Sequence, residues 1–245
     1  MQVPPIEAYD ELDSTNAEAR RRAEVGEFGP VWITAARQTA GRGRRGRAWE
    51  TASGNLAATL LFSTPKSAAQ AAQVSFVAAL AAADLADTCV GDGEARLKWP
   101  NDLMLRGRKA AGILVESGTG FEKSVWLAVG LGINLAHAPR AVERPAIAFA
   151  EVMSTPPPLP GPALDVLASR FAHWLSIWNT QGFAPIAHAW TQRAQGLGQM
   201  CEARLPNQTH RGIAEGLDPD GALRLRLADG AILRITAGDV FFGEA

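Results

Sequence analysis

Cysteine is scarce in this chain of 245 residues, which contains only two, Cys89 and Cys201. Two cysteines so far apart in the sequence predict neither a disulfide framework nor a cysteine metal site, and they fit a reducing compartment. An excess of charge of either sign is also absent, because 24 basic residues stand against 25 acidic ones. This balance argues against a general nucleic-acid-binding or membrane-surface protein.

Long uninterrupted apolar runs are missing as well. The most apolar stretch, residues 67–86, is mostly alanine and is interrupted by Gln70, Gln73 and Asp84, so we expect a buried helix and not a membrane span. The first residues lack a basic end followed by an apolar core, which argues against a signal peptide. We therefore expect a cytoplasmic protein with a sizeable core in one domain or two.

Lysine is much rarer than arginine, with four residues against 20, and we ascribe this bias to composition and not to function. The remaining lysines deserve separate consideration because arginine cannot replace a compact, mobile ammonium group everywhere. They are Lys66, Lys98, Lys109 and Lys123.

The pattern of apolar residues predicts an α+β domain followed by a small antiparallel β-barrel. Strands are expected over residues 3–9, 31–36, 56–62, 96–99, 102–105 and 112–116, with a further apolar run over 124–135. Helices are expected from about residue 14 to 25 and over 67–89, 164–178 and 185–194, with a proline-rich connector at 154–162. From about residue 198 short alternating strands follow, so we divide the chain into residues 1–196 and 197–245.

A segment rich in arginine and glycine, residues 37–47, carries five arginines and no acidic residue. Glycine lets the backbone approach a ligand closely, and guanidinium groups bind phosphate through two hydrogen bonds at once. The segment therefore predicts an anion-binding loop that can close over a polyphosphate. Taken alone, the same run of charge is also typical of a solvated basic loop or of an RNA-binding segment.

Gly41, Gly43 and Gly46 in this segment match the glycine spacing of a dinucleotide-binding turn. That interpretation fails because residues 48–54 do not open a convincing helix and no acidic residue stands about 20 positions further on. We therefore exclude a Rossmann site.

Two lysines bracket an Asn-Asp pair in the segment from Lys98 to Lys109. Lysine can polarise a phosphoryl or acyl group, and aspartate can position an amine or a metal ion. An ordinary Asn-Asp turn with surface lysines explains the pattern equally well.

Glycines at 130 and 132 inside an apolar run point either to sheet twist or to a ligand packed on a strand. Residues 14–16 offer a routine helix cap or a site for a small polar group.

Taken together and in order, these segments resemble the biotin protein ligase family. The matching residues are 13–16, 38–47 with Trp49, 98–102, 108–109 with 112–116, and 130–134. The resemblance spans nearly the whole chain, and the combination of the arginine-rich heptad with Lys-Trp-Pro-Asn-Asp is highly specific. It implies a class II synthetase-like catalytic domain, with a mixed sheet flanked by helices, and a C-terminal SH3-like β-barrel.

The resemblance also implies a reaction in two steps. The carboxylate of biotin attacks the α-phosphate of ATP, which gives biotinyl-5′-AMP and pyrophosphate. A lysine of a biotin carboxyl carrier protein, an acetyl-CoA carboxylase subunit, then attacks the mixed anhydride and releases AMP. Mg²⁺ would be held mainly through the phosphates, with no protein metal site.

Site residues are carried over from the resemblance by position. The catalytic set is Lys109, Arg44, Arg47 and Asp102. The biotin-binding set is Ser14, Thr15, Asn16, Gln38, Gly41, Arg42, Gly43, Arg44, Lys109, Gly112, Gly130 and Gly132. The set expected around ATP and the adenylate is Arg42, Arg44, Arg45, Arg47, Trp49, Lys98, Asn101 and Asn134.

Three alternatives remain at this point. A lipoate ligase would share the adenylation chemistry, although the arginine-rich heptad speaks against it. A nucleic-acid-binding module would need aromatic residues among the basic ones, and only Trp49 is nearby. A catalytically inactive relative is disfavoured by the presence of Lys98, Asp102 and Lys109. Because only 12 residues precede Asp13, we also expect no operator-binding domain, and we expect a possible homodimer.

Overall fold

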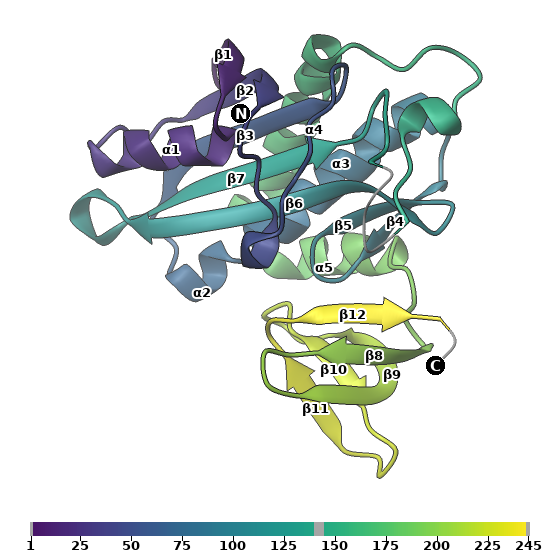
Figure 1. Cartoon of the computed structure of the whole chain (residues 1–245). Coiled ribbons are helices and arrows are strands. Elements are labelled where there is room, and N and C mark those ends of the chain that lie inside the picture. The colour runs from purple at the N-terminus through teal and green to yellow at the C-terminus, as the bar shows by residue number, and fades with distance from the viewer. Residues whose placement is uncertain (1, 140–144, 244–245) are drawn as a thin grey trace.

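The computed structural model describes residues 2–139 and 145–243 and confirms an α+β fold with a C-terminal all-β domain (Figure 1). A seven-stranded mixed sheet has the order β1-β2-β3-β7-β6-β5-β4, and a five-stranded antiparallel sheet has the order β11-β10-β9-β8-β12. The strands of the first sheet are β1 (Ile6–Leu12), β2 (Val31–Gln38), β3 (Leu56–Thr64), β4 (Ala95–Lys98), β5 (Asp102–Leu105), β6 (Arg108–Thr119) and β7 (Val125–Ile133). Those of the second are β8 (Met200–Arg204), β9 (Thr209–Leu217), β10 (Leu223–Arg226), β11 (Ile232–Ile235) and β12 (Asp239–Phe242).

Helices cover the two faces of the larger sheet unequally. The helices are α1 (Thr15–Glu24), α2 (Ala68–Ala71), α3 (Val74–Val90), α4 (Pro160–Gln181) and α5 (Phe183–Gln192). Helix α3 packs on β4 to β7, with α4 and α5 beside it, whereas the short α1 packs on the opposite face against β2, β3 and β7 (Figure 1). Much of that second face is therefore left for other segments.

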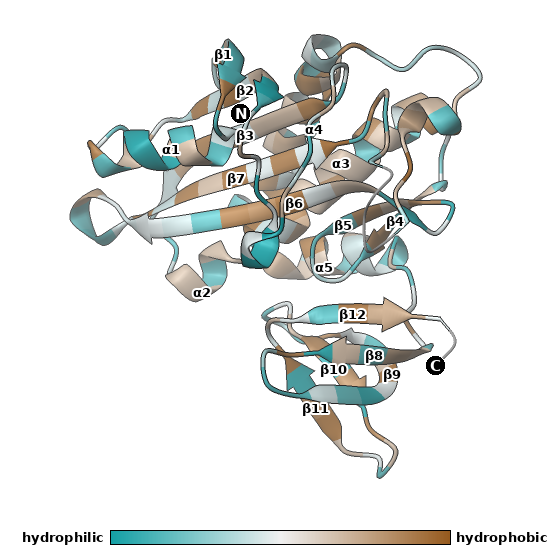
Figure 2. Ribbon diagram, viewed as in Figure 1, coloured by the Kyte–Doolittle hydropathy of each residue, from teal (hydrophilic) through white to brown (hydrophobic). Residues whose placement is uncertain are grey.

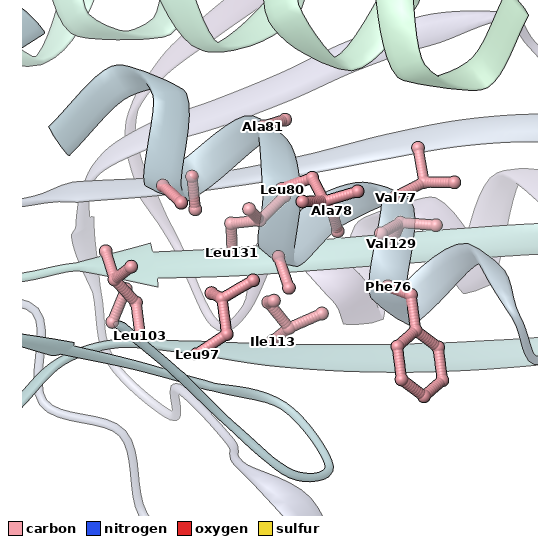
Figure 3. Packing of buried hydrophobic residues seen from close by; sticks show 14 of the residues in the cluster. Phe76, Val77, Ala78, Leu80, Ala81, Leu97, Leu103, Ile113, Val129 and Leu131 are labelled. Carbon is pink, nitrogen blue, oxygen red and sulfur yellow. The ribbon is translucent and has the colours of Figure 1, made fainter. Parts of the chain in front are cut away.

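The main core lies between α3 and the sheet. Figure 3 shows Phe76 and Leu80 of α3 beside Leu97, Ile113 and Val129 of the strands. Hydropathy follows this arrangement, because β3 is strongly hydrophobic and α1 largely hydrophilic (Figure 2). Burial of such apolar surface at about 25 cal/mol per Å² is the main force that holds the helix on the sheet.

Side-chain size along β7 decides where the second face is filled. Alternate residues such as Val129 point into the main core, and the residues between them point to the α1 side. On that side Trp126 and Ala128 pack with the small core beneath α1, and Gly130 and Gly132 follow. The side chains on this face thus become smaller along the strand and end in two glycines, which leaves space over the carboxyl end of the strand.

The structure corrects three boundaries. The helix expected over 67–89 is interrupted before Val74, and the Gln73 side chain at this break accepts a hydrogen bond from the Trp178 indole (3.1 Å). Helix α4 begins at Pro160, inside the expected connector, because proline is tolerated in the first turn of a helix. Strand β6 runs on to Thr119, because it pairs with β7 over its whole outer half.

Residues 68–90 are long and apolar enough to cross a membrane by length and composition, but 67% of their apolar 18-residue stretch is buried inside the protein. The segment is thus the core helix of the larger sheet.

The smaller sheet docks on the end of the larger one that carries β4 and β5. The Trp99 indole N–H donates to the Gly221 carbonyl (3.1 Å), and a side chain at Gly221 would meet the rings of Phe76 and Phe183. The connecting segment is tied to β4 through the Leu97 N–H and the Arg193 carbonyl (2.8 Å). These contacts bring β12 next to the arginine-rich segment (Figure 1).

Candidate active site

A cavity of about 490 Å³ lies on the α1 side of the sheet, over the glycines of β6 and β7. It extends from the start of α1 to β12 and has two differently built parts. Its lining includes, among others, Ser14, Thr15, Asn16, Gln38, Arg42, Gly43, Arg44, Arg47, Trp49, Asn101, Asp102, Lys109, Gly112, Gly130, Gly132, Asn134 and Asp239.

The first part, which we call the neutral end, consists of Ser14, Thr15, Asn16 and Gln38, and the fully buried Thr59 contacts Thr15 and Asn16 from outside the lining. The three residues at the start of α1 are buried, and the Ser14 hydroxyl caps the helix by accepting from the Ala17 N–H (3.5 Å). The side-chain amide oxygen of Gln38 accepts from the Thr15 N–H (2.8 Å), and its amide nitrogen donates to the Thr51 hydroxyl (3.0 Å). These neutral groups are held by one another, without an ion pair among them.

Asn16 is the most constrained side chain of the neutral end. Its amide nitrogen donates to the Glu116 carboxylate (2.8 Å) and to the Leu114 carbonyl (3.3 Å), and its amide oxygen accepts from the Thr59 hydroxyl (2.7 Å). A Cβ on Gly130 would lie 2.0 Å from that oxygen. Glycine at position 130 is thus required because Asn16 occupies the space of its side chain.

The arginine-rich segment folds into a closed turn above the sheet. The Trp49 N–H donates to the Gly41 carbonyl (2.9 Å), and the Gly43 N–H donates to the Arg47 carbonyl (2.7 Å). A Cβ on Gly41 would lie 2.3 Å from the Trp49 carbonyl oxygen, so the close approach of the two loop ends requires glycine there. The turn faces β12 in Figure 1.

Asp239 of β12 forms ion pairs with three arginines of this turn. Its carboxylate lies 2.7 Å from the Arg47 guanidinium, 3.4 Å from that of Arg45 and 3.8 Å from that of Arg44. The aspartate is buried, with 5% of its surface exposed. The second domain thus supplies a negative charge that partly neutralises the loop.

The Arg44 side chain is also held by two neutral acceptors. It donates to the Asn101 amide oxygen and to the Gly238 carbonyl, each at 3.2 Å. Asn101 is itself fixed to β6, since its amide donates to the Ile113 carbonyl (2.6 Å). Burial lowers the pKa of the Arg44 guanidinium, and the charge of Asp239 opposes this shift.

The Lys109 ammonium lies 2.5 Å from the Asp102 carboxylate and 5.5 Å from the centre of the Trp49 ring. The indole of Trp49 in turn covers Gly132, where a Cβ would lie 2.2 Å from it. We call Lys109 and the arginines Arg42, Arg44 and Arg47 the cationic wall. The cationic wall and the neutral end line the same cavity.

Asn134 supplies a buried hydrogen-bond acceptor beside the wall. Its amide nitrogen donates to the Ile147 carbonyl (3.2 Å), whereas its amide oxygen is buried and has no hydrogen-bond partner among the residues that the structure describes. A buried acceptor without a partner is unfavourable unless a ligand supplies the donor.

The structure brings most of the predicted site residues into one cavity lining, although their roles stay predictions. Gly41, Arg45 and Lys98 lie outside that lining. The Lys98 ammonium lies instead 5.6 Å from the Phe241 ring of β12. Sequence reasoning missed Asp239, Thr59 and the contact of Glu116 with Asn16, and no local pattern distinguishes these residues from other acids or strand threonines.

Within residues 2–139 and 145–243, no group of three or more His, Cys, Asp or Glu side chains could hold a metal ion. Of the carboxylates that line the cavity, Asp102 and Asp239 are engaged by cations.

Comparison with known protein families gives two matches along the chain. Residues 16–134 match the biotin/lipoate A/B protein ligase family, and residues 196–243 match the biotin protein ligase C-terminal domain.

Individual relatives cover almost the whole chain. The biotin–[acetyl-CoA-carboxylase] ligase of Paracoccus denitrificans is 45% identical over 242 residues, covering 94% of this chain and 98% of its own. The bifunctional ligase/repressor BirA of Bacillus subtilis is 30% identical, covering 96% of this chain and 73% of its own. Among solved structures, the biotin protein ligase of Aquifex aeolicus in complex with biotin and ATP has a TM-score of 0.83 at 24% identity, covering 98% and 99% of the two chains.

Proposed function

Because the chain belongs to the biotin/lipoate A/B protein ligase family, we propose that the two-part cavity is where it activates biotin and transfers it to protein. The protein is an ATP-dependent biotin–[acetyl-CoA-carboxylase] ligase, as is its 45% identical relative. The observation that carries the assignment of the site is the placement of a neutral polar cluster and a cationic wall in one cavity. The reaction needs both, because a ligand with a neutral polar ring must meet the triphosphate of ATP in one site.

The neutral end binds the ureido ring of biotin. That ring has two N–H donors and one carbonyl acceptor, and Ser14, Thr15, Asn16 and Gln38 supply hydroxyl and amide partners at this end. The glycines at 130 and 132 let Asn16 and Trp49 lie close against the sheet, so that these two side chains line the cavity in which the ligand binds. A lipoyl dithiolane has no donor or acceptor of this kind, so the neutral end favours biotin over lipoate.

The cationic wall binds ATP and the adenylate. Arg42, Arg44 and Arg47 receive the phosphates, with Arg45 and Lys98 nearby, and Trp49 with Asn101 and Asn134 surrounds the nucleotide. The buried amide oxygen of Asn134 accepts a hydrogen bond from the exocyclic amine of adenine, which satisfies the acceptor that has no protein partner.

In the first step a carboxylate oxygen of biotin forms a bond to the α-phosphorus, and the bond from that phosphorus to the bridging oxygen of pyrophosphate breaks. Two anions must meet, and the Lys109 ammonium offsets their repulsion and the charge of the crowded phosphorus centre. Arg44 and Arg47 add positive charge on the other side. Mg²⁺ would be held mainly by the phosphates and would offset their charge, since Asp102 and Asp239 are already paired with Lys109 and the arginines.

In the second step the amine of the carrier lysine forms a bond to the biotinyl carbonyl carbon, and the bond from that carbon to the AMP oxygen breaks. Asp102 orients the incoming amine, and the closed arginine turn keeps water from the mixed anhydride. Gly41 and Gly43 let that turn lie close over the adenylate.

The remaining expectations rest on the sequence. We place the division of the chain at residues 196 and 197, the enzyme in the cytoplasm, and its carrier substrate in acetyl-CoA carboxylase. A homodimer and the lack of DNA binding stay predictions.

Incubation with biotin, ATP and Mg²⁺ tests the proposal, with pyrophosphate release and biotinyl-AMP followed by mass spectrometry beside a lipoate control. Adenylate is expected with biotin and not with lipoate. Adenylate with neither acid would refute the assignment of the cavity.

A further inference from the structure

The side chain of Asn101, in the short turn between β4 and β5, connects the arginine turn to the sheet. Its amide nitrogen donates to the Ile113 carbonyl of β6 at 2.6 Å, and its amide oxygen accepts from the Arg44 guanidinium at 3.2 Å. The backbone adds a further contact, since the Ile113 N–H donates to the Asn101 carbonyl at 3.1 Å. Asn101 is thus bound to β6 on one side and to Arg44 on the other.

The two partners of the Asn101 side chain fix the orientation of its amide group. A backbone carbonyl only accepts hydrogen bonds, and a guanidinium group only donates them. The amide nitrogen must therefore face Ile113 and the amide oxygen must face Arg44, because the reverse order would set two acceptors and two donors against each other. Asn101 thus presents an acceptor to Arg44 from a fixed place beside β6.

The Arg44 guanidinium is held from both domains. The Gly238 carbonyl of the second domain accepts from it at 3.2 Å, and the Asp239 carboxylate lies 3.8 Å away. Among the residues that the structure describes, its hydrogen-bond acceptor in the first domain is Asn101. Without this amide the guanidinium would be tied to the second domain alone.

Lys109, the other cation of the first step, lies on the strand to which Asn101 is bound. Its ammonium pairs with Asp102, the residue that follows Asn101 in the chain. Strand β6 therefore sets the place of Lys109 directly and that of Arg44 through Asn101. Cations that act on one phosphate must be held at fixed places, because electrostatic stabilisation falls with distance and depends on preorganisation.

We infer that Asn101 is a positioning residue: it ties Arg44 to β6 and so keeps the Arg44 guanidinium at a fixed place relative to Lys109, where both act on the α-phosphate. The inference rests on the proposed function, since it takes the phosphate to be that of ATP and then of biotinyl-AMP. Asn101 lines the same cavity, and it acts on the adenylate through Arg44.

Asn101→Ala removes both side-chain hydrogen bonds and keeps the backbone contact with Ile113. Biotinyl-AMP formed on the enzyme should leave about three- to fivefold faster, because Arg44 retains only its contacts with the second domain. The KM for biotin should stay within about twofold of the wild type, since the side-chain contacts of Asn101 lie outside the neutral end. A chase of labelled biotinyl-AMP with an excess of the unlabelled compound measures the release. Asn207→Ala, in an exposed bend of the second domain, is the matched control and should behave as the wild type.

A double variant separates an action through Arg44 from a contact of Asn101 with the nucleotide itself. In the Arg44→Gly background, Asn101→Ala should speed the release by less than about 1.5-fold, because the group that it positions is gone. Effects that multiply would overturn the inference. An unchanged release rate in either single variant would overturn it too, as would a biotin KM that rises as much as the release rate.

Asn101→Ser carries the test if Asn101→Ala does not fold. The serine hydroxyl is polar but too short to reach both Ile113 and Arg44, so this variant should also release the adenylate faster. A wild-type chain that makes no biotinyl-AMP would refute the proposed function instead. Adenylate formation with unchanged release from the Asn101 variants would refute only the role of Asn101.

Discussion

The neutral end and the cationic wall of the cavity differ in how their polar groups are satisfied. The neutral end is built within one domain, and its hydroxyls and amides bond to one another between α1, β2 and β3. The cationic wall is held by carboxylates, with Asp102 on Lys109 and Asp239 of the second domain on the arginines. The neutral end is thus assembled within one domain, whereas the cationic wall draws on residues of both domains.

The difference follows from the energy of buried charge. Neutral groups that bond to one another can be buried at small cost, but a buried cation without a counter-charge is strongly unfavourable. Asp102 and Asp239 supply the counter-charges of the wall within the protein itself. We expect substitutions at the wall to change the reaction rate and loop order, and substitutions at the neutral end to change biotin affinity.

The largest effect is expected for Lys109→Ala. The change removes the cation next to the reacting carboxylate and α-phosphate, so the rate of adenylate formation should fall about 100- to 1,000-fold. Pyrophosphate release under saturating biotin and ATP measures it. Lys66→Ala, which removes a lysine over the Trp178 ring, is the control. A rate within a few-fold of the wild type would remove Lys109 from its role.

Gly130→Ala breaks the neutral end instead. The new methyl group would lie 2.0 Å from the Asn16 amide oxygen and displace that side chain, so the biotin KM should rise about 10- to 100-fold. The KM for ATP should change little. Gly161→Ala, whose Cβ meets nothing within 4 Å, is the matched control. A rise in the KM for ATP as large as that for biotin would contradict the separation of the two ends.

Arg44→Gly removes one guanidinium group from the cationic wall. Loss of the guanidinium should let biotinyl-AMP leave about tenfold faster and modify bystander lysines, because one charge-assisted contact is gone. Trapping of released adenylate with a bystander protein measures the leak. Arg37→Ala is the control, since Arg37 belongs to the same basic segment but pairs with Glu11. Unchanged retention of the adenylate would argue against a closing loop.

Asp239→Asn tests the counter-charge from the second domain. The arginine turn should exchange its amide hydrogens about tenfold faster in the free enzyme, because the buried carboxylate that binds three arginines is gone. Hydrogen exchange of peptides that cover residues 42–48 measures this change. Asp229→Asn, in an exposed turn of the same domain, should leave the exchange unchanged. Equal exchange rates of residues 42–48 in the two variants would show that the arginine turn is held without Asp239.

The smallest effect is expected for Asp13→Asn, outside the cavity at the start of α1. Hydrogen bonds from Arg21 lower the pKa of Asp13 from 3.8 to about 2. The folded-state pKa is depressed, so the pair stabilises the fold above pH 3.8 and loses this contribution as the pH falls toward 2. The stability gap between wild type and variant in urea should therefore narrow from about pH 5 to about pH 3. A stability difference that stays constant over this pH range would show that it does not come from the charge of Asp13.

Much of the fold could be predicted from alternation and turn residues, but some boundaries could not. Pro160 looked like part of a connector because proline breaks helices, yet the first turn of a helix does not need its N–H. Strand β6 was expected only over residues 112–116, where the apolar run is, yet pairing with β7 extends the strand to Thr119. At β6 a neighbouring strand thus decided the boundary, whereas at Pro160 the position within the helix did.

By itself the sequence determined the types of chemistry, because arginines among glycines, lysines around Asn-Asp and glycines in an apolar strand occur together and in an order that resembles one family. Only the tertiary structure decided the partners. Asp239 meets Arg45 across 194 positions of the chain, and Glu116 meets Asn16 across 100. In a sequence of balanced charge, no local pattern shows which carboxylate will meet which cation or amide. The strength of such a contact depends on distance and burial, and these exist only after the domains have packed.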